Sequence, residues 1–339
     1  MKISKLSCLY YPTTVVLIDD DPSFLKSIAF RLDPNMSYKT YLDPREALDY
    51  LKNLKSQNKL FSHSVALNPE TENYIENQFS VQFNLSKIYQ EVYNPNIFNE
   101  VSIIIADYAM PNMNGADLFR NLADVPIKKM MLTGQADESS AVDLFNEGLI
   151  DKFILKKNTQ TLKDLINQSI QELQYKYFQD LSEVIFKSLS LQPYACFDDP
   201  DFIDFFYKIK NDISASSYYM LEPSGSFLFF DENARPTWLL VKTKEEMIEF
   251  AKQASAEGAP DEVAHAIEQG TKIIHFNNFD EYTHATEGHW EDYLYSAQKL
   301  NGKKEYRYAI VNSLPGFPLE QDKIQSFSKY LHSDSTQQE

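Results

Sequence analysis

Short apolar runs that each end in a polar residue recur through the first half of the chain, and they constrain its fold most. The runs lie at residues 15–18, 101–106, 130–132 and 153–155. Unbroken runs of this kind are typical of parallel strands that are buried on both faces. Segments with helical apolar spacing lie between them, at residues 22–32, 44–51, 115–122 and 138–147. With a further short strand at 37–41, this alternation predicts a doubly wound parallel sheet with right-handed crossovers.

The residues that directly follow these runs are polar, and their side chains have functional groups that can react or bind ligands. In chain order they are Asp19 to Asp21, Asp107, Thr133 and Lys156. In an open parallel sheet the site lies beyond the carboxyl ends of the strands. We therefore expect these side chains to meet in one crevice, although they are far apart in the sequence.

This set of groups suits the binding of a phosphoryl group. Clustered carboxylates repel one another unless a hard cation lies among them, and oxygen ligands suit Mg²⁺. Magnesium, an ammonium and a hydroxyl would together neutralise and hold phosphoryl oxygens, while a carboxylate nucleophile would form an acyl phosphate. A single Asp after a strand is more often a turn residue or a helix N-cap. The recurrence at successive strand ends favours a site.

Four motifs resemble those of the receiver domain of two-component response regulators. The Val-Leu-Ile-Asp-Asp-Asp-Pro segment at 16–22 is similar to the first strand and acidic pair of that family. The Asp-Tyr-Ala-Met-Pro-Asn-Met-Asn-Gly segment at 107–115 is similar to its phosphoacceptor loop and is the most specific match. Met-Leu-Thr-Gly at 131–134 and Phe-Ile-Leu-Lys at 153–156 complete the set. The resemblance covers about residues 13–172, and it implies a flavodoxin-like fold.

The resemblance assigns the nucleophile and the metal ligands. Asp107 would accept the phosphoryl group from a histidine kinase. Asp19 and Asp20 would hold Mg²⁺ together with Asp107, Asp20 more directly than Asp19, and the backbone carbonyl of Ala109 would also coordinate the ion.

The resemblance also assigns the groups that sense the phosphate. Thr133 and Lys156 would bind the phosphoryl oxygens. Phe153 would swing inward together with Thr133 on activation and pass the change to the face formed by residues 138–156, where receivers of this kind often dimerise.

The sequence departs from the receiver pattern in two places. The family's Lys-Pro pair is Lys156-Lys157 here, so the proline after the lysine is missing. In addition, Asp20 and Asp107 are 87 positions apart, about twice the usual separation in the family. We place the surplus at about residues 56–99, which are too apolar for a mere linker. Long segments of this kind are usually functional or disordered. We expect an ordered lobe that covers one flank and aids partner choice.

A long helix is predicted at the junction of the two halves. Apolar residues recur in steps of three and four through residues 159–192, and Pro193 ends the run. The helix either pairs with a second copy of the chain or packs within the chain on both domains. We accordingly assign residues 1–172 to the receiver domain, 159–192 to a joining helix and 193–339 to an output domain of unknown type.

The second half predicts an α+β domain with an antiparallel sheet. Strands are expected at 218–222, 226–231, 237–243, 272–276 and 306–311. Helices are expected at 201–213, 245–254, 259–269 and 287–299.

Charge and motifs restrict what this output domain does. Residues 171–339 carry 15 basic and 28 acidic side chains, whereas DNA-binding modules are usually basic. No helix-turn-helix with a basic second helix is apparent, so DNA is not the expected partner. No phosphate-binding loop or nucleophile elbow is found either.

Three histidines of the second half suggest a metal site, as an alternative to a solvated polar loop. His275, His284 and His289 lie near Asp280, Glu281 and Glu287 in the sequence. No pair has the close spacing of a chelate with a carboxylate base between, so a solvated polar loop is the favoured interpretation.

Two widely spaced cysteines, Cys8 and Cys196, indicate a reducing cytoplasm. There is no secretory signal and no apolar run of the length that spans a membrane.

The sequence therefore predicts a cytoplasmic response regulator, switched by phosphorylation on Asp107, with an acidic output module. The expected partners are a histidine kinase, a second copy of the chain and an unknown downstream protein. Its size, enlarged receiver and unfamiliar output half resemble response regulators of quorum-sensing circuits, which implies control of virulence and growth-phase switching. Two alternatives remain for the output half: an unrecognised enzyme, or a module that binds nucleic acid or nucleotides.

Overall fold

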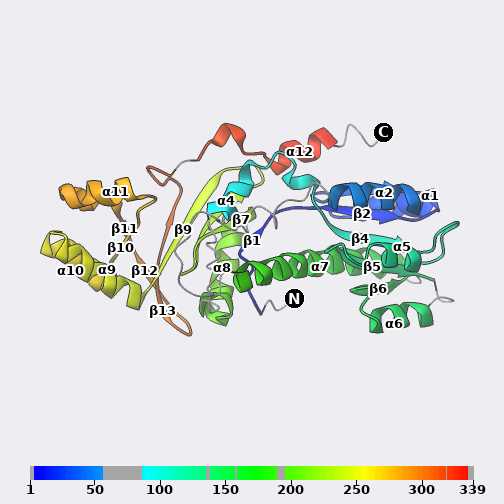
Figure 1. Cartoon of the computed structure of the whole chain (residues 1–339), viewed down its shortest axis with the longest axis horizontal. Coiled ribbons are helices and arrows are strands. Elements are labelled where there is room, and N and C mark those ends of the chain that lie inside the picture. The colour runs from blue at the N-terminus through cyan, green and yellow to red at the C-terminus, as the bar shows by residue number, and fades with distance from the viewer. Residues whose placement is uncertain are drawn as a thin grey trace, which may run out of the picture.

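The computed structural model describes residues 4–55, 86–134, 138–156, 159–188, 195–317 and 319–334. Figure 1 shows a parallel sheet at one end, an antiparallel sheet at the other, and the long helix α7 (Thr159–Ser188) running between them. The predicted fold class, a flavodoxin-like receiver followed by an α+β domain, is confirmed.

The parallel sheet has five strands in the order β3-β2-β4-β5-β6. Their bounds are β2 Thr14–Ile18, β3 Ser37–Tyr41, β4 Val101–Asp107, β5 Lys128–Thr133 and β6 Lys152–Leu155. All neighbouring pairs are parallel. The central strands β2, β4 and β5 are buried along their whole length, which explains why their sequences show no alternation of apolar and polar residues.

Helices cover both faces of this sheet. They are α1 Pro22–Ala29, α2 Pro44–Lys55, α5 Gly115–Asn121 and α6 Glu138–Asn146. One core cluster packs α2, α5 and α6 against one face, and a second packs α1 and the first half of α7 against the other. Side-chain caps start two of the helices: Asp21 accepts from the amides of Ser23 and Phe24, and Asn114 accepts from that of Asp117.

The antiparallel sheet has six strands in the order β1-β7-β8-β9-β13-β12. Their bounds are β1 Leu9–Tyr10, β7 Ala215–Glu222, β8 Ser226–Asp231, β9 Pro236–Thr243, β12 Gln298–Asn301 and β13 Glu305–Val311. A separate pair is formed by β10 Lys272–Ile274 and β11 Leu294–Ser296. The helices of this half are α8 Pro200–Asp212, α9 Lys244–Ala256, α10 Asp261–Glu268, α11 Phe279–His284 and α12 Phe327–Asp334.

The prediction of a helix over residues 287–299 is wrong. The chain makes a short 3-10 turn, η6 (Trp290–Tyr293), and then continues as strands β11 and β12. Residues 294–296 pair with β10 and residues 298–301 pair with β13, so backbone hydrogen bonds to these partners override the local helical spacing.

The first residues of the chain belong to the antiparallel sheet, which the sequence did not indicate. Strand β1 pairs with β7, Leu9 opposite Tyr219 and Tyr10 opposite Tyr218. Leu6, Cys8 and Leu9 are fully buried in the core of the second half. The chain thus starts in one sheet, crosses to build the other, and returns through α7.

The end of the insertion packs on the second half as well. The first part, residues 56–85, lies outside the described residues. The remainder forms α4 Ser86–Gln90 and two 3-10 turns, η1 Glu91–Tyr93 and η2 Ile97–Asn99. Ile88, Val92 and Phe98 are buried in the core of the second half. Phe98 also packs against Phe327 of α12, with the ring centroids 5.0 Å apart and the rings tilted by 57°.

Helix α7 packs on both sheets. In its first half Leu162, Ile166 and Ile170 join the core of the parallel sheet. In its second half Phe178 and Leu181 join the core of the antiparallel half. Of the two alternatives for this helix, the structure therefore shows packing within the chain, because these apolar positions are already covered.

Candidate functional site

The topology of the parallel sheet brings four polar side chains to its carboxyl edge. Asp19 follows β2, Asp107 and Thr133 are the last residues of β4 and β5, and Lys156 follows β6. Strand β4 lies between β2 and β5, so Asp107 occupies the middle of the group. The convergence predicted from the sequence is thus present in the structure.

Lys156 bridges two carboxylates at this edge. Its Nζ lies 2.8 Å from Oδ2 of Asp19 and 2.7 Å from Oδ1 of Asp107. The side chain of Asp19 is 3% exposed and that of Asp107 is 10% exposed, whereas Lys156 retains 24% of its surface. The ammonium also lies 4.1 Å from the ring centroid of Phe24, a cation–π contact that the sequence did not reveal. A single cation therefore partly neutralises two buried anions.

Burial and the ammonium act in opposite directions on the protonation of these groups. Burial raises the pKa of Asp19, while hydrogen bonds from Lys156 and from the amide of Asp21 lower it; burial prevails. For Lys156, burial lowers the pKa, but the contacts with Asp107 and Asp19 outweigh it, and the net pKa is raised. Lys156 therefore stays charged at neutral pH, and its charge is held at the strand ends.

The donor atoms fit a hard divalent cation. Carboxylate oxygens of Asp19, Asp20 and Asp107 all lie within 4.8 Å of one another, and Asp20 is exposed to solvent. An all-oxygen set with one open side suits Mg²⁺, which keeps several of its waters. Ala109 lies at the same edge, and its amide donates to Oδ2 of Asp107 at 3.2 Å.

Thr133 ends β5 and Phe153 lies in β6, so both are on the side of Asp107 that is away from Asp19. Thr133 is fully buried, and its hydroxyl donates to the carbonyl of Gly134 at 3.2 Å. Phe153 is half-buried and meets Phe145 of α6 edge to face, with ring centroids 6.3 Å apart. A movement of the Phe153 ring would therefore be felt by α6.

Gly115 is a further residue on which the site depends, and the sequence analysis gave it no role. Its amide donates to the carbonyl of Tyr108 at 3.0 Å, which closes the loop after Asp107. A Cβ at this position would lie 2.3 Å from the carbonyl oxygen of Asp107, closer than any real contact. Glycine at the first position of a helix, a place where other residues are preferred, was the signal that could have identified it.

A comparison with solved structures identifies the family. The response regulator LqsR of Legionella pneumophila is 32% identical to this chain, with a TM-score of 0.78. The match covers 96% of this chain and 95% of LqsR, so it includes both halves. The chain belongs to the response regulators. The family resemblance read from the strand-end motifs is confirmed.

Two further solved structures each align with about half of the chain. An adenylate cyclase from Rhodopirellula baltica covers 52% of it at 22% identity and a TM-score of 0.34, over 98% of its own length. A response regulator receiver domain protein from Clostridium thermocellum covers 47% at 20% identity and a TM-score of 0.30, over 95% of its own length. No family model and no curated protein matches the sequence.

The histidines of the second half do not form one group. His275 is buried, with Nδ1 3.6 Å from Oε1 of Glu222, which Lys242 neutralises at 2.8 Å. Burial lowers the pKa of His275, so it is neutral beside this pair. His284 and His289 are instead exposed and lie together near Asp292.

The three acidic residues considered with these histidines are dispersed. Glu281 accepts hydrogen bonds from the amide and side chain of Asn277, whereas Asp280 and Glu287 are exposed.

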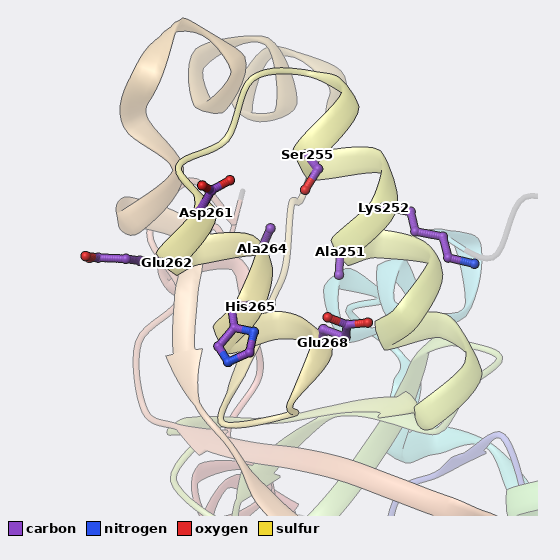
Figure 2. Close-up of a pocket in the computed structure, with 8 residues that line it drawn as sticks. All are labelled: Ala251, Lys252, Ser255, Asp261, Glu262, Ala264, His265 and Glu268. Atoms are coloured by element: carbon purple, nitrogen blue, oxygen red, sulfur yellow. The ribbon is translucent and has the colours of Figure 1, made fainter.

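A further cavity lies elsewhere in the second half. It is a groove of about 480 Å³ between α9 and α10, bordered by the side chains drawn in Figure 2. Small residues, Ala251 and Ala264, lie between the helices, and the rim carries three carboxylates together with Lys252 and His265, of which Lys252 points away from the groove. This acidic lining does not suit nucleic acid.

Among the described helices, none has the length and apolar character needed to cross a bilayer.

Proposed function

We propose that the chain is a response regulator switched by phosphorylation of Asp107, with a histidine kinase as phosphodonor. The observation that carries this proposal is the Lys156 ammonium, 2.7 Å from Asp107 and 2.8 Å from Asp19 at the end of the central strands. An ammonium in this position would stabilise a phosphoryl group on Asp107, because it would neutralise the added charge.

Each residue at the sheet edge has a separate role in the phosphoryl transfer. One carboxylate oxygen of Asp107 attacks the phosphorus of the kinase's phosphohistidine, so that the new P–O bond forms as the P–N bond breaks and the imidazole leaves and takes up a proton. Lys156 and the hydroxyl of Thr133 hold the phosphoryl oxygens. Asp19, Asp20 and the carbonyl of Ala109 would hold Mg²⁺ together with Asp107. When bound, Mg²⁺ supplies charge neutralisation for the incoming group. The exposed side of Asp20 leaves the edge open to the donor.

The signal leaves the site through α6 and strand β6. Phosphorylation draws Thr133 toward the new oxygens, and Phe153 follows into the vacated space. Phe145, which contacts Phe153, is 49% exposed, and Val142 on the same helix is 39% exposed. Exposed apolar side chains on a helix commonly mark an interaction surface. We infer that this face of α6 pairs two copies of the chain in the phosphorylated state.

The second half is the output module, and its partner is a protein in the cytoplasm. Its 28 acidic against 15 basic side chains over residues 171–339 oppose binding to DNA. LqsR is a response regulator with the same two-part organisation. The resemblance to quorum-sensing regulators supports a place in the control of virulence and growth phase.

Phosphorylation and assembly are tested on the purified full chain with Mg²⁺ and acetyl phosphate. Intact mass spectrometry should show the gain of one phosphoryl group in the wild type and none in Asp107→Asn. Asp117→Asn, an exposed carboxylate on α5, is the matched control and should be modified like the wild type. An unmodified wild type, or equal modification of Asp107→Asn, would overturn the proposal. Sedimentation of the same samples tests pairing, which Phe145→Ala should abolish while leaving the mass gain intact.

A further inference from the structure

We propose that His284, His289 and Asp292 bind a divalent transition-metal ion on the second half of the chain, independently of the site at Asp107. One imidazole nitrogen from each histidine and one carboxylate oxygen of Asp292 all lie within 4.8 Å of one another. All three side chains are exposed, so an ion reaches them directly from solvent. Rotation of the two imidazole rings out of their parallel arrangement would bring these donors to metal–ligand distances of about 2.0–2.2 Å, and the exposed side chains have room for it.

An irregular turn of the backbone creates this arrangement. Helix α11 ends at His284 and continues as a π-helical turn, η5 (Ala285–His289). In a continuous α-helix, residues five apart point to different sides, whereas the break in this turn brings His284 and His289 to the same side. The two imidazole rings accordingly stack 4.1 Å apart and within 6° of parallel. Gly288, with φ of 108°, leaves the helical conformation and kinks the backbone directly before His289, a conformation that glycine adopts without strain.

The neighbouring groups orient the two imidazoles. The hydroxyl of Tyr293 lies 3.0 Å from Nδ1 of His284 and leaves Nε2 as the nitrogen available for a metal. A metal-binding histidine typically has its second nitrogen hydrogen-bonded in this way. Nδ1 of His289 lies 3.9 Å from Oδ2 of Asp292, so the carboxylate already faces the second ring.

The segment that carries the ligands is anchored on both sides. Ala285, which directly follows His284, and Trp290, which directly follows His289, are both buried in the core. The side chain of Asn278 caps α11 by accepting from the amide of Glu281 at 3.0 Å. Because the backbone is held, binding requires only side-chain movement, and little ordering cost opposes it.

The charge and donor types indicate which ions bind. Residues 277–294 contain five carboxylates and no Lys or Arg, which raises the local concentration of cations. Two imidazole nitrogens with one carboxylate favour Zn²⁺ and related transition metals over Mg²⁺ or Ca²⁺. Three protein ligands leave one position open for water or for a group from a partner.

The test is equilibrium dialysis of the tag-free full chain against Zn²⁺ in an excess of Mg²⁺, which occupies the carboxylates at the parallel-sheet edge. The wild type should take up one equivalent of Zn²⁺. His284→Ala and His289→Ala should each weaken binding at least about tenfold, as should Tyr293→Phe through loss of the orienting hydroxyl. His265→Ala, an exposed helical histidine of the same half, is the matched control and should bind like the wild type.

Co²⁺ provides a second readout, because its visible absorption reports the ligand set. Intense bands should appear in the wild type and in His265→Ala and be lost in His284→Ala/His289→Ala. Far-UV circular dichroism of the double variant should match that of the wild type, since both side chains are exposed. Equal Zn²⁺ affinity of the wild type and the double variant would refute the proposal, as would the absence of uptake by the wild type.

Discussion

A buried carboxylate between the two halves offers a quantitative test of how they are joined. Glu100, which directly precedes β4, accepts hydrogen bonds from the hydroxyls of Tyr11 and Tyr177. Tyr11 follows β1 and lies 2.6 Å from Oε2, whereas Tyr177 belongs to α7 and bonds Oε1. Burial raises the pKa of Glu100, and the two hydroxyls offset this in part. The three residues therefore tie the parallel sheet, the joining helix and the start of the chain together.

Removal of one hydroxyl should lower the free energy of unfolding most strongly while Glu100 is ionised. Tyr177→Phe deletes a hydrogen bond to a buried charged group, which costs about 1.5–3 kcal/mol of unfolding free energy. In a Glu100→Gln background the same substitution deletes a bond to a neutral group and should cost only about 0.5–1.5 kcal/mol. The double-mutant cycle should therefore show a coupling of about 1 kcal/mol or more. Tyr11→Phe should repeat the pattern.

The contribution of Glu100 to the stability of the chain changes with pH in a definite direction. Because the folded pKa of Glu100 is raised above its ordinary value of 4.5, its contribution is most favourable below that value and is lost as the pH rises through the folded pKa. Glu100→Gln should consequently gain stability relative to the wild type as the pH is raised from about 4.5. The gain should level off above the raised pKa.

Urea denaturation followed by tryptophan fluorescence measures these changes in unfolding free energy in the half of the chain that contains the two tyrosines. Both tryptophans, Trp238 and Trp290, are buried in the second half, whose core includes Tyr11 and Tyr177. If Tyr177→Phe costs the same in both backgrounds, within about 0.5 kcal/mol, then the carboxylate does not link these elements and the reasoning fails.

Three further predictions concern single residues. Gly115→Ala should destabilise the chain by about 1–3 kcal/mol in thermal unfolding and lower phosphorylation of Asp107, since the new Cβ would displace the Asp107 carbonyl; an unchanged melting temperature would contradict this. Lys156→Met should tighten Mg²⁺ binding at least about tenfold in calorimetry, because an ammonium and a divalent cation a few ångströms apart repel by several kcal/mol; weaker binding would show that the ammonium does not oppose the ion. Cys8, whose pKa burial raises to about 12, and Cys196, whose pKa burial also raises, should resist iodoacetamide in the native chain and react only after denaturation, as mass spectrometry would show.

The parallel sheet and its edge could be predicted because each decisive signal is local. A run such as Val101 to Ala106 is buried on both faces and needs no partner sequence to be recognised. Because the strands are parallel, their carboxyl ends lie at one edge of the sheet, so Asp107 and Lys156 meet although they are 49 positions apart.

The elements that the sequence did not reveal depend on distant partners. Strand β1 has only two residues and is defined by its pairing with β7. Residues 294–301 have helical spacing but take the strand conformation that β10 and β13 impose. The stacking of His284 on His289 accompanies a kink at Gly288, and such a break in a helix is not among the apolar patterns by which helices are recognised.

The pairing of β1 with β7 also has a consequence for synthesis on the ribosome. Leu9 and Tyr10 are synthesised roughly 200 residues before Tyr218 and Tyr219, with which they pair. At typical translation rates of about 5–20 residues per second, the nascent strand waits roughly 10–40 s for its partner. The parallel sheet lies wholly within this interval and can be complete before the antiparallel one begins. Because β1 is the edge strand, it can then join last, without threading through anything already folded.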